Sequence, residues 1–437
     1  MNKSSSLTTS FASVQWFFFI FANVVVVPIS IGLAFDLPSY QIATILRSSL
    51  IVTGIACILQ GIAGHRFPLM EGPSGVMWSL ILNLGLSASA LGLSLSEIGG
   101  GIATGMLLAG AVTIILAACN LTSFMQKVFT PMVMSVYLLL LTFQLTFIFF
   151  NGMLTVKNDG TLDLFTTLFA FAIAIFVGLL KIKGNQTIGN FSILIGMVLG
   201  WILYALLFPT GEPLNGESAA AFSIFPLGKP NLQFGIIAIT FLGSIVSLSN
   251  TVASIQAASR LLVEKASAGQ YRNSYFLTGV YSLIASLFGQ VTYAPFASSI
   301  GFLESTQIFD RRSFLIGGAL ISFVGIIPSL GFILATLPIQ VGSAVLFVAY
   351  LQLFGTSLKS LNGYTFNSIT IYRLAAPVLF GVSLMAVDSS LFAGLPAVIQ
   401  PLLSNGFIMG VLLSIIIEST INWTAFETEQ TNKQSPS

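Results

Sequence analysis

The chain has 437 residues, of which 55% are hydrophobic and only 7% are charged, and its formal net charge is +2 at pH 7. A soluble domain carries about 25% charged residues, so this composition excludes a protein whose whole surface faces water. The basic residues are dispersed, which argues against a nucleic-acid partner. The two cysteines, Cys57 and Cys119, do not indicate a disulfide framework. The chain is therefore predicted to be an all-α polytopic membrane protein.

In chain order, the apolar runs predict about fourteen transmembrane segments, since a spanning helix needs about 20 apolar residues. The third and tenth runs are short and interrupted by Pro, Gly and Ser, and a polar loop at 209–232 separates the first seven runs from the last seven. The runs lie at 11–35, 41–64, 68–86, 98–118, 128–152, 163–181, 187–208, 233–258, 272–289, 293–303, 313–335, 337–356, 370–387 and 397–417.

The basic residues predict how the chain is oriented in the plasma membrane. With an even number of spans and the N-terminus inside, only Lys157 and Lys229 fall outside, and both termini are cytoplasmic. Arg47 lies within the second run and is expected to extend its side chain to the external interface. The basic residues on the cytoplasmic side would be Lys3, Arg66, Lys127, Lys181, Lys183, Arg260, Lys265, Arg272, Arg311, Arg312, Lys359, Arg373 and Lys433.

A weak internal repeat links the two halves. Thr53, Gly54 and Gly64 match Thr278, Gly279 and Gly289 at an offset of 225 residues (278 − 53). In both halves the matched residues end a long run just before an interrupted one. Since each half has an odd number of spans, the repeats would have opposite orientations in the membrane.

The two interrupted segments, 67–75 and 292–301, are the predicted transport site. Backbone at membrane depth must be hydrogen-bonded, so such breaks are tolerated only where they are buried or line a cavity. Paired breaks at corresponding places in two halves indicate a binding site, with the N-termini of the following half-helices directed towards it. Ordinary kinks are the alternative explanation.

Four stretches resemble the nucleobase–ascorbate transporter family, the uracil and xanthine/uric acid permeases. The first-span Val14-Gln15-Trp16 with Val27-Pro28 resembles the family's "LQH…VP" pattern. Residues 72–75 resemble its "G-[ST]-S-F" motif, 246–251 its eighth-span "VES/VEH" stretch, and 296–301 its "F-[AS]-[QE]-N-[IV]-G" motif. The resemblance extends over the whole chain in length and number of spans.

The resemblance implies a fold of two inverted seven-span repeats, with short strands in spans three and ten that meet at the substrate. It implies a core domain formed by 1–122 and 211–335, a gate domain formed by 123–210 and 336–420, and a cytoplasmic tail at 421–437. It also implies a proton or sodium gradient as the driving force and a homodimer formed through the gate domain. The lipid bilayer is the remaining partner, and no cofactor is implied.

The chain departs from the family at the polar positions of the site. The eighth-span glutamate falls on Asn250, the position four residues later on Ser254, and the tenth-span Gln/Glu–Asn pair on Ser298 and Ser299. The first-span histidine falls on Trp16, and the ninth-span aspartate falls near Thr278. The substrate and the coupling ion are therefore open questions.

Asn250 and Glu71 are the two polar residues to which roles can be assigned. Ser247, Asn250 and Ser254 have helical spacing, and an amide offers both a donor and an acceptor to a nucleobase edge. The alternative for Asn250 is interhelical hydrogen bonding. Glu71 precedes the Gly72-Pro73 break and is a candidate proton carrier, because intramembrane carboxylates are costly and typically functional. Its alternative is a cytoplasmic position, paired with Arg66 or His65.

The sequence lacks a P-loop and metal-ligand clusters, and it predicts a carrier rather than an enzyme. We predict a secondary active transporter for a purine such as xanthine, uric acid or hypoxanthine. The predicted substrate-binding residues are Gly75, Asn250, Ser254, Phe296, Ser298 and Ser299. Two alternatives remain: a carrier of small anions such as sulfate or benzoate on a related fold, and an uncoupled channel.

Overall fold

The computed structural model describes residues 6–120, 127–157, 159–208, 222–296, 298–361, 364–392, 394–396, 399–421 and 423. The predicted domain boundaries near 122 and 210, and most of the predicted tail, lie outside these residues. In the first half the elements are α1 (Ser6–Val24), α2 (Val26–Ala34), α3 (Ser39–Ile62), β1 (Glu71–Pro73), α4 (Gly75–Leu86), α5 (Ala88–Leu91), α6 (Leu95–Ala118), α8 (Pro131–Met153), α9 (Leu164–Lys183) and α10 (Gln186–Leu207).

The second half repeats this order of long helices around one strand. Its elements are α11 (Phe234–Ser247), α12 (Ser249–Leu261), α13 (Ala268–Leu287), β2 (Tyr293–Pro295), α14 (Ser298–Thr306), α15 (Arg311–Ile326), α16 (Pro328–Ala335), α17 (Ile339–Ser360), α18 (Ser368–Met385), the 3₁₀ turn η1 (Ser389–Phe392), α19 (Gln400–Leu403) and α20 (Gly406–Thr420).

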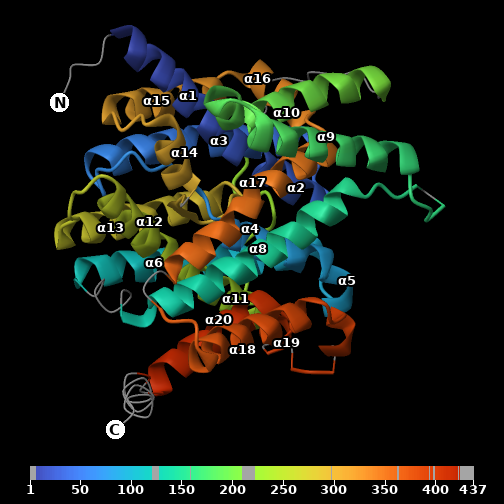
Figure 1. Ribbon diagram of the computed structural model, residues 1–437. Coiled ribbons are helices and arrows are strands. Elements are labelled where there is room, and N and C mark those ends of the chain that lie inside the picture. Colours follow the sequence, from blue (N-terminus) through green and yellow to red (C-terminus); the bar gives the residue numbers. More distant parts are fainter. Residues whose placement is uncertain are drawn as a thin grey trace.

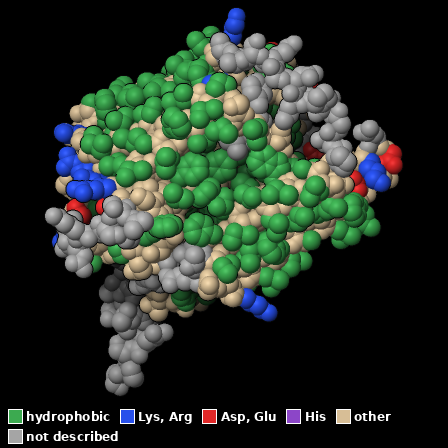
Figure 2. Space-filling view, turned by 90° about the horizontal axis from the view of Figure 1, so that it is seen from above, with side chains coloured by type: hydrophobic (Ala, Val, Ile, Leu, Met, Phe, Trp, Pro, Cys, Tyr) green, Lys and Arg blue, Asp and Glu red, His purple; other side chains and the backbone are tan. Residues whose placement is uncertain are grey.

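The helices form a multi-pass membrane protein, as predicted. In the described part of the chain, eight candidate spans are long and apolar enough to cross a bilayer. Each of the fourteen predicted apolar runs coincides with a helix, a broken helix or a strand followed by a helix. The number fourteen stays a prediction, since the other helices in the described part of the chain do not combine the length and the hydropathy of a span. Figure 2 shows a face covered by hydrophobic side chains, with Lys, Arg, Asp and Glu near its margins.

The two halves pack as an inverted repeat, in which each helix pair has a counterpart. Helix α3 packs on α15, and its counterpart α13 packs on α6. The helices α8 and α17, which occupy equivalent positions in the two halves, form a pair of their own that crosses the middle of the molecule (Figure 1). The pairs α9·α10 and α18·α20 flank it in the same way.

The repeated glycines lie where these helices cross. A Cβ atom on Gly54 of α3 would lie 2.2 Å from the carbonyl oxygen of Gly318 on α15. In the other half, a Cβ on Gly279 of α13 would lie 2.9 Å from the carbonyl oxygen of Gly110 on α6. Membrane helices approach closely only through such small residues, which explains why these glycines recur in both halves.

Three spans are broken in the middle, and the released backbone groups are bonded by other elements. α11 ends and α12 begins at Leu248, whose carbonyl accepts a hydrogen bond from the Tyr275 hydroxyl at 3.2 Å. α15 ends before Pro328, which cannot donate within a helix. A further break at Val25 separates α1 from α2.

Arg47 bonds the end of the broken α15 through its guanidinium group. Its Nε donates to the Gly325 carbonyl at 3.3 Å, and its Nη2 donates to the Ile326 carbonyl at 3.4 Å. The residue is only 6% exposed. The carbonyls at the C-terminus of the broken helix are favourable partners for the cation, and its extension towards the external interface stays a prediction.

Candidate functional site

The two interrupted segments meet in a short antiparallel sheet at the centre of the molecule. Residues 71–73 of β1 pair with 293–295 of β2, in the register Glu71↔Pro295. Beyond the strands, the Ser74 N–H donates to the Thr292 carbonyl and the Phe296 N–H donates to the Met70 carbonyl, each at 2.8 Å. All six strand residues are buried. The pairing satisfies the backbone of both breaks, which is the condition for non-helical chain inside a membrane protein.

Four serines in or near the predicted site fix this sheet to its neighbours. The Ser247 and Ser74 hydroxyls lie 2.6 Å apart, which joins the end of α11 to the residue after β1. Ser254 donates to the Pro295 carbonyl at 3.2 Å, and Ser299 accepts from the Met70 N–H at 3.0 Å. Ser247 and Ser254, which have helical spacing on span eight, therefore face the strands. Ser254 and Ser299 hold the backbone of the strands in place.

Glu71 lies inside the protein, and its carboxylate has no contact with Arg66 or His65. Its Oε1 accepts a hydrogen bond from the Thr278 hydroxyl on α13 at 3.1 Å, and the residue is 0% exposed. Gln60 on α3 donates from its Nε2 to the same Thr278 oxygen at 3.3 Å. Among the described residues, Oε2 of Glu71 has no hydrogen-bond partner. The predicted alternative of a pair with Arg66 or His65 is thus wrong, because the fold turns this side chain towards spans two and nine.

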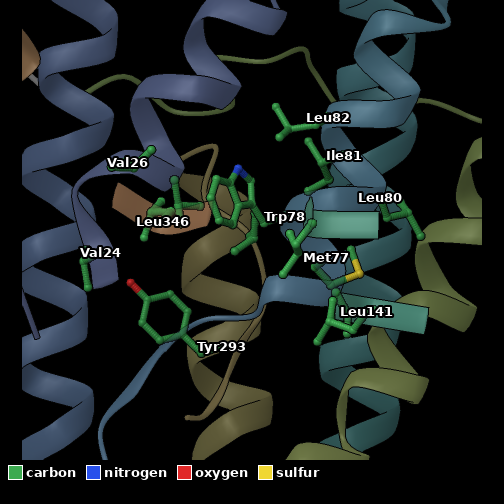
Figure 3. Close-up of a cluster of buried hydrophobic side chains, with 14 of the residues drawn as sticks. Val24, Val26, Met77, Trp78, Leu80, Ile81, Leu82, Leu141, Tyr293 and Leu346 are labelled. Carbon is green, nitrogen blue, oxygen red and sulfur yellow. The ribbon is translucent and has the colours of Figure 1, made fainter. Parts of the chain in front are cut away.

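Helix α4, which follows β1, packs against α8. A Cβ on Gly75, the first residue of α4, would lie 3.6 Å from Leu145 Cδ1 of α8. Figure 3 shows Met77 and Trp78 of α4 with Tyr293 of β2, together with Leu141 of α8 and Leu346 of α17.

Asn250, Ser298 and Phe296 lie around the same strands. Asn250 is partly exposed on α12, beside the Tyr137 hydroxyl of α8. Ser298 opens α14, and its buried Oγ has no partner in the described structure. Phe296 packs against Gly72 of the other strand, where a Cβ would lie 3.2 Å from its ring. The structure thus brings together polar groups from both breaks and from span eight.

The sequence did not indicate Gln60 or Tyr137 as site residues. Gln60 lies within an apolar run, and its partner Thr278 is 218 residues away along the chain. Tyr137 lies in an uninterrupted apolar helix, where a tyrosine usually packs. The only sequence signal for Gln60 is that it is an amide inside a span, which is costly without a partner.

His65 is fully buried. Its Nδ1 accepts from the Phe67 N–H at 3.1 Å, and its carbonyl accepts from Gln270 at 2.7 Å. It therefore fixes the turn into β1. No group of three or more His, Cys, Asp and Glu with metal-binding geometry occurs among the described residues.

Comparison with known proteins identifies related sequences over nearly the whole chain. The family model Xan_ur_permease, described as a permease family, matches residues 7–390. The "Putative purine permease YwdJ" of Bacillus subtilis is 28% identical over 422 residues, covering 94% of this chain and 95% of that protein. The uric acid transporter UacT of Escherichia coli is 24% identical, covering 92% and 83%.

Solved structures share the fold at low sequence identity. The transmembrane domain of the cyanobacterial bicarbonate transporter BicA aligns with a TM-score of 0.57 at 14% identity, over 93% of this chain and 96% of that chain. SLC26A9 aligns with a TM-score of 0.63 at 15% identity, over 96% of this chain and 67% of that chain. These neighbours confirm an architecture of two inverted repeats.

Proposed function

Since the chain belongs to the nucleobase–ascorbate transporter family, whose permease model covers most of it, we propose that it is a secondary active carrier of a purine base, driven by protons. The observation that supports this function is the buried β1–β2 sheet, which gathers polar groups from both broken spans. The purine class is supported by relatives named as purine, uric acid and xanthine permeases.

The groups around the sheet suit a flat, polar heterocycle. Asn250 provides a donor and an acceptor on one side chain, and Ser298 provides a hydroxyl without a partner among the described residues. The N-termini of α4 and α14 begin at Gly75 and Ser298, and their free N–H groups can donate to ring carbonyls. Phe296 provides an aromatic face. A purine dione such as xanthine or urate presents the alternating donors and acceptors that this set would bind.

Glu71 is the proposed proton-binding group. Asn250 cannot titrate, whereas a carboxyl group can bind and release one proton. The Thr278 hydroxyl and the Gln60 amide can stabilise the ionised form, and Oε2 is free of described partners in this state. Because Glu71 is itself part of β1, a change in its charge would act on the substrate through the strand backbone. Coupling would then depend on the sheet, without direct contact between the carboxyl group and the purine.

Uptake of labelled purines into proteoliposomes tests the function directly. With an inward proton gradient, we expect saturable accumulation of xanthine or urate that a protonophore abolishes. Unlabelled xanthine, hypoxanthine and urate should compete, while benzoate and sulfate should not. Competition by benzoate or sulfate alone would identify an anion carrier, and uptake without accumulation would identify a channel.

The arrangement of helices supports the proposed division into moving parts. Spans one to four and eight to eleven would form the core around the strands, and α8, α9, α10, α17, α18 and α20 would form the gate. Rocking of the core against the gate would then expose the site alternately to either side. We further propose that both termini are cytoplasmic and that the gate mediates a homodimer.

A further inference from the structure

The gate helix α8 presents a buried hydroxyl to the candidate site. Tyr137 is 0% exposed, and its ring packs edge-on against Phe407 of α20 at 5.6 Å between centroids. The hydroxyl lies beside Ser249 and Asn250 of α12. Nevertheless, it has no hydrogen-bond partner among the residues that the structure describes, and the same is true of the Ser249 hydroxyl.

Two neighbouring buried hydroxyls, on Tyr137 and Ser249, thus lack a partner among the described residues. A buried polar group without a partner costs about 1–3 kcal/mol, so such groups are rare unless a ligand or water satisfies them. Here one hydroxyl belongs to the gate and the other to the core. Asn250 also lies beside the Tyr137 hydroxyl, at the position on which the eighth-span glutamate of the related family falls.

We propose that Tyr137 is a specificity-determining residue of the gate, whose hydroxyl donates a hydrogen bond to a ring carbonyl of the purine held by Asn250. This inference rests on the proposed function and extends it, since it adds a contact from the opposite domain. A purine carbonyl would satisfy the donor, while the Ser249 hydroxyl and the Asn250 amide would bind the ring edge from the core. The site is then complete only when core and gate close on the ligand.

The conservative variant Tyr137→Phe removes the hydroxyl and keeps the ring. In the purified protein we expect the Kd for xanthine to rise about tenfold, the loss of roughly one well-formed buried hydrogen bond. The KM for uptake should rise in parallel with little change in Vmax. Tyr204→Phe is the matched control, because Tyr204 lies on the gate helix α10 and its ring stacks on Phe208 at 4.7 Å, away from the strands. Its Kd should be unchanged.

Two further measurements separate a ligand contact from a structural role. The melting temperature of unliganded Tyr137→Phe should equal or exceed that of the wild type, because the hydroxyl makes no bond to lose. A lowered melting temperature would overturn the proposal. Unsubstituted purine, which lacks exocyclic oxygens, should bind the variant and the wild type equally. An unchanged Kd for xanthine, or an equal loss for purine, would also overturn it. If the wild type neither binds nor transports purines, the proposed function itself fails.

Discussion

The carboxyl group of Glu71 is predicted to link transport to the proton gradient. One coupled proton supports about tenfold accumulation per unit of pH difference, since one unit corresponds to 1.36 kcal/mol. Glu71→Gln keeps the shape of the side chain and its contact with Thr278 but cannot bind a proton. We expect this variant to equilibrate xanthine without accumulating it, and protonophore should have no effect on its initial rate of uptake.

Glu97→Gln is the control for this experiment. Glu97 caps the start of α6 by hydrogen bonds with Ser94 at the surface, far from any strand contact. Its removal should leave the accumulation of substrate intact. Accumulation by Glu71→Gln that still depends on the proton gradient would contradict the assignment.

The ion pair between Arg373 and Glu418 is predicted to stabilise the protein. Arg373 Nε and Nη2 donate to the two Glu418 oxygens at 2.8 Å each, and the side chains are 5% and 7% exposed. Removing one partner leaves the other charge buried, so Glu418→Gln or Arg373→Met should each cost about 3–5 kcal/mol. Thermal unfolding in detergent would measure the loss.

A second ion pair provides the comparison. Lys359 and Glu304 lie 3.8 Å apart, with side chains 70% and 47% exposed. Such a pair contributes about 0–1 kcal/mol, so Lys359→Met should barely shift the melting temperature. If Lys359→Met and Arg373→Met lowered the free energy of unfolding equally, burial would not be the cause of the stabilisation by the Arg373–Glu418 pair. The double variant Arg373→Met/Glu418→Leu should recover part of the loss, because no unpaired charge remains.

At the scale of helices, the repeated glycines should determine whether the core can assemble. A Cβ on Gly54 would lie 2.2 Å from the Gly318 carbonyl oxygen, a distance at which one backbone must move. We expect Gly54→Ala and Gly279→Ala to lower the melting temperature, by roughly 1–3 kcal/mol of unfolding free energy. Gly178→Ala on α9 is the control, since a Cβ there meets nothing within 4 Å. Equal effects at all three positions would show that helix crossing is not the reason for the repeat.

Elements whose signals are local could be predicted from the sequence. The apolar runs, the interrupted spans and the inverted halves depend on hydrophobic length, on Pro and Gly, and on a repeat that has a packing cause at Gly54 and Gly279. The family itself was identified from motifs near the breaks. Pro28 and Pro328 lie close to two of the three broken helices, so these breaks also had a local signal.

The break at Leu248 and the hydrogen-bond partner of Glu71 depend on contacts between residues that are far apart in the sequence. Leu248 has no Pro or Gly beside it, and its free carbonyl is bonded by Tyr275 from another helix. Glu71 was compared with its sequence neighbours Arg66 and His65, whereas the fold turns it to Thr278. This error came from considering only nearby residues as partners in a chain whose halves interleave.

For the whole molecule, both termini are predicted to face the cytoplasm. The bias of basic residues towards one side motivates this orientation. A C-terminal fusion to a reporter that is active only in the cytoplasm should give full signal, and a periplasm-dependent reporter at the same place should be silent. The opposite pattern would place the C-terminus outside and would contradict the predicted orientation.

The motion of the core against the gate can be tested by covalent links. An ideal Cβ on Gly342 of α17 lies 3.9 Å from Val26 Cβ of α2, within the range of about 3.5–4.5 Å that a disulfide requires. This pair joins the proposed gate to the proposed core. Val26→Cys/Gly342→Cys, made in a Cys119→Ser background because Cys119 is exposed, should lose uptake on oxidation and regain it on reduction.

A link inside the gate should have no such effect if the gate moves as one body. An ideal Cβ on Gly196 of α10 lies 3.5 Å from Val177 Cβ of α9, so Val177→Cys/Gly196→Cys offers similar geometry between two helices assigned to the gate. We expect oxidation to leave its uptake unchanged, with formation of the disulfide verified by the loss of free thiol. Inhibition by both links would mean that the gate itself deforms during transport. Inhibition by neither would mean that α2 and α17 move together, and the division into core and gate would have to be redrawn.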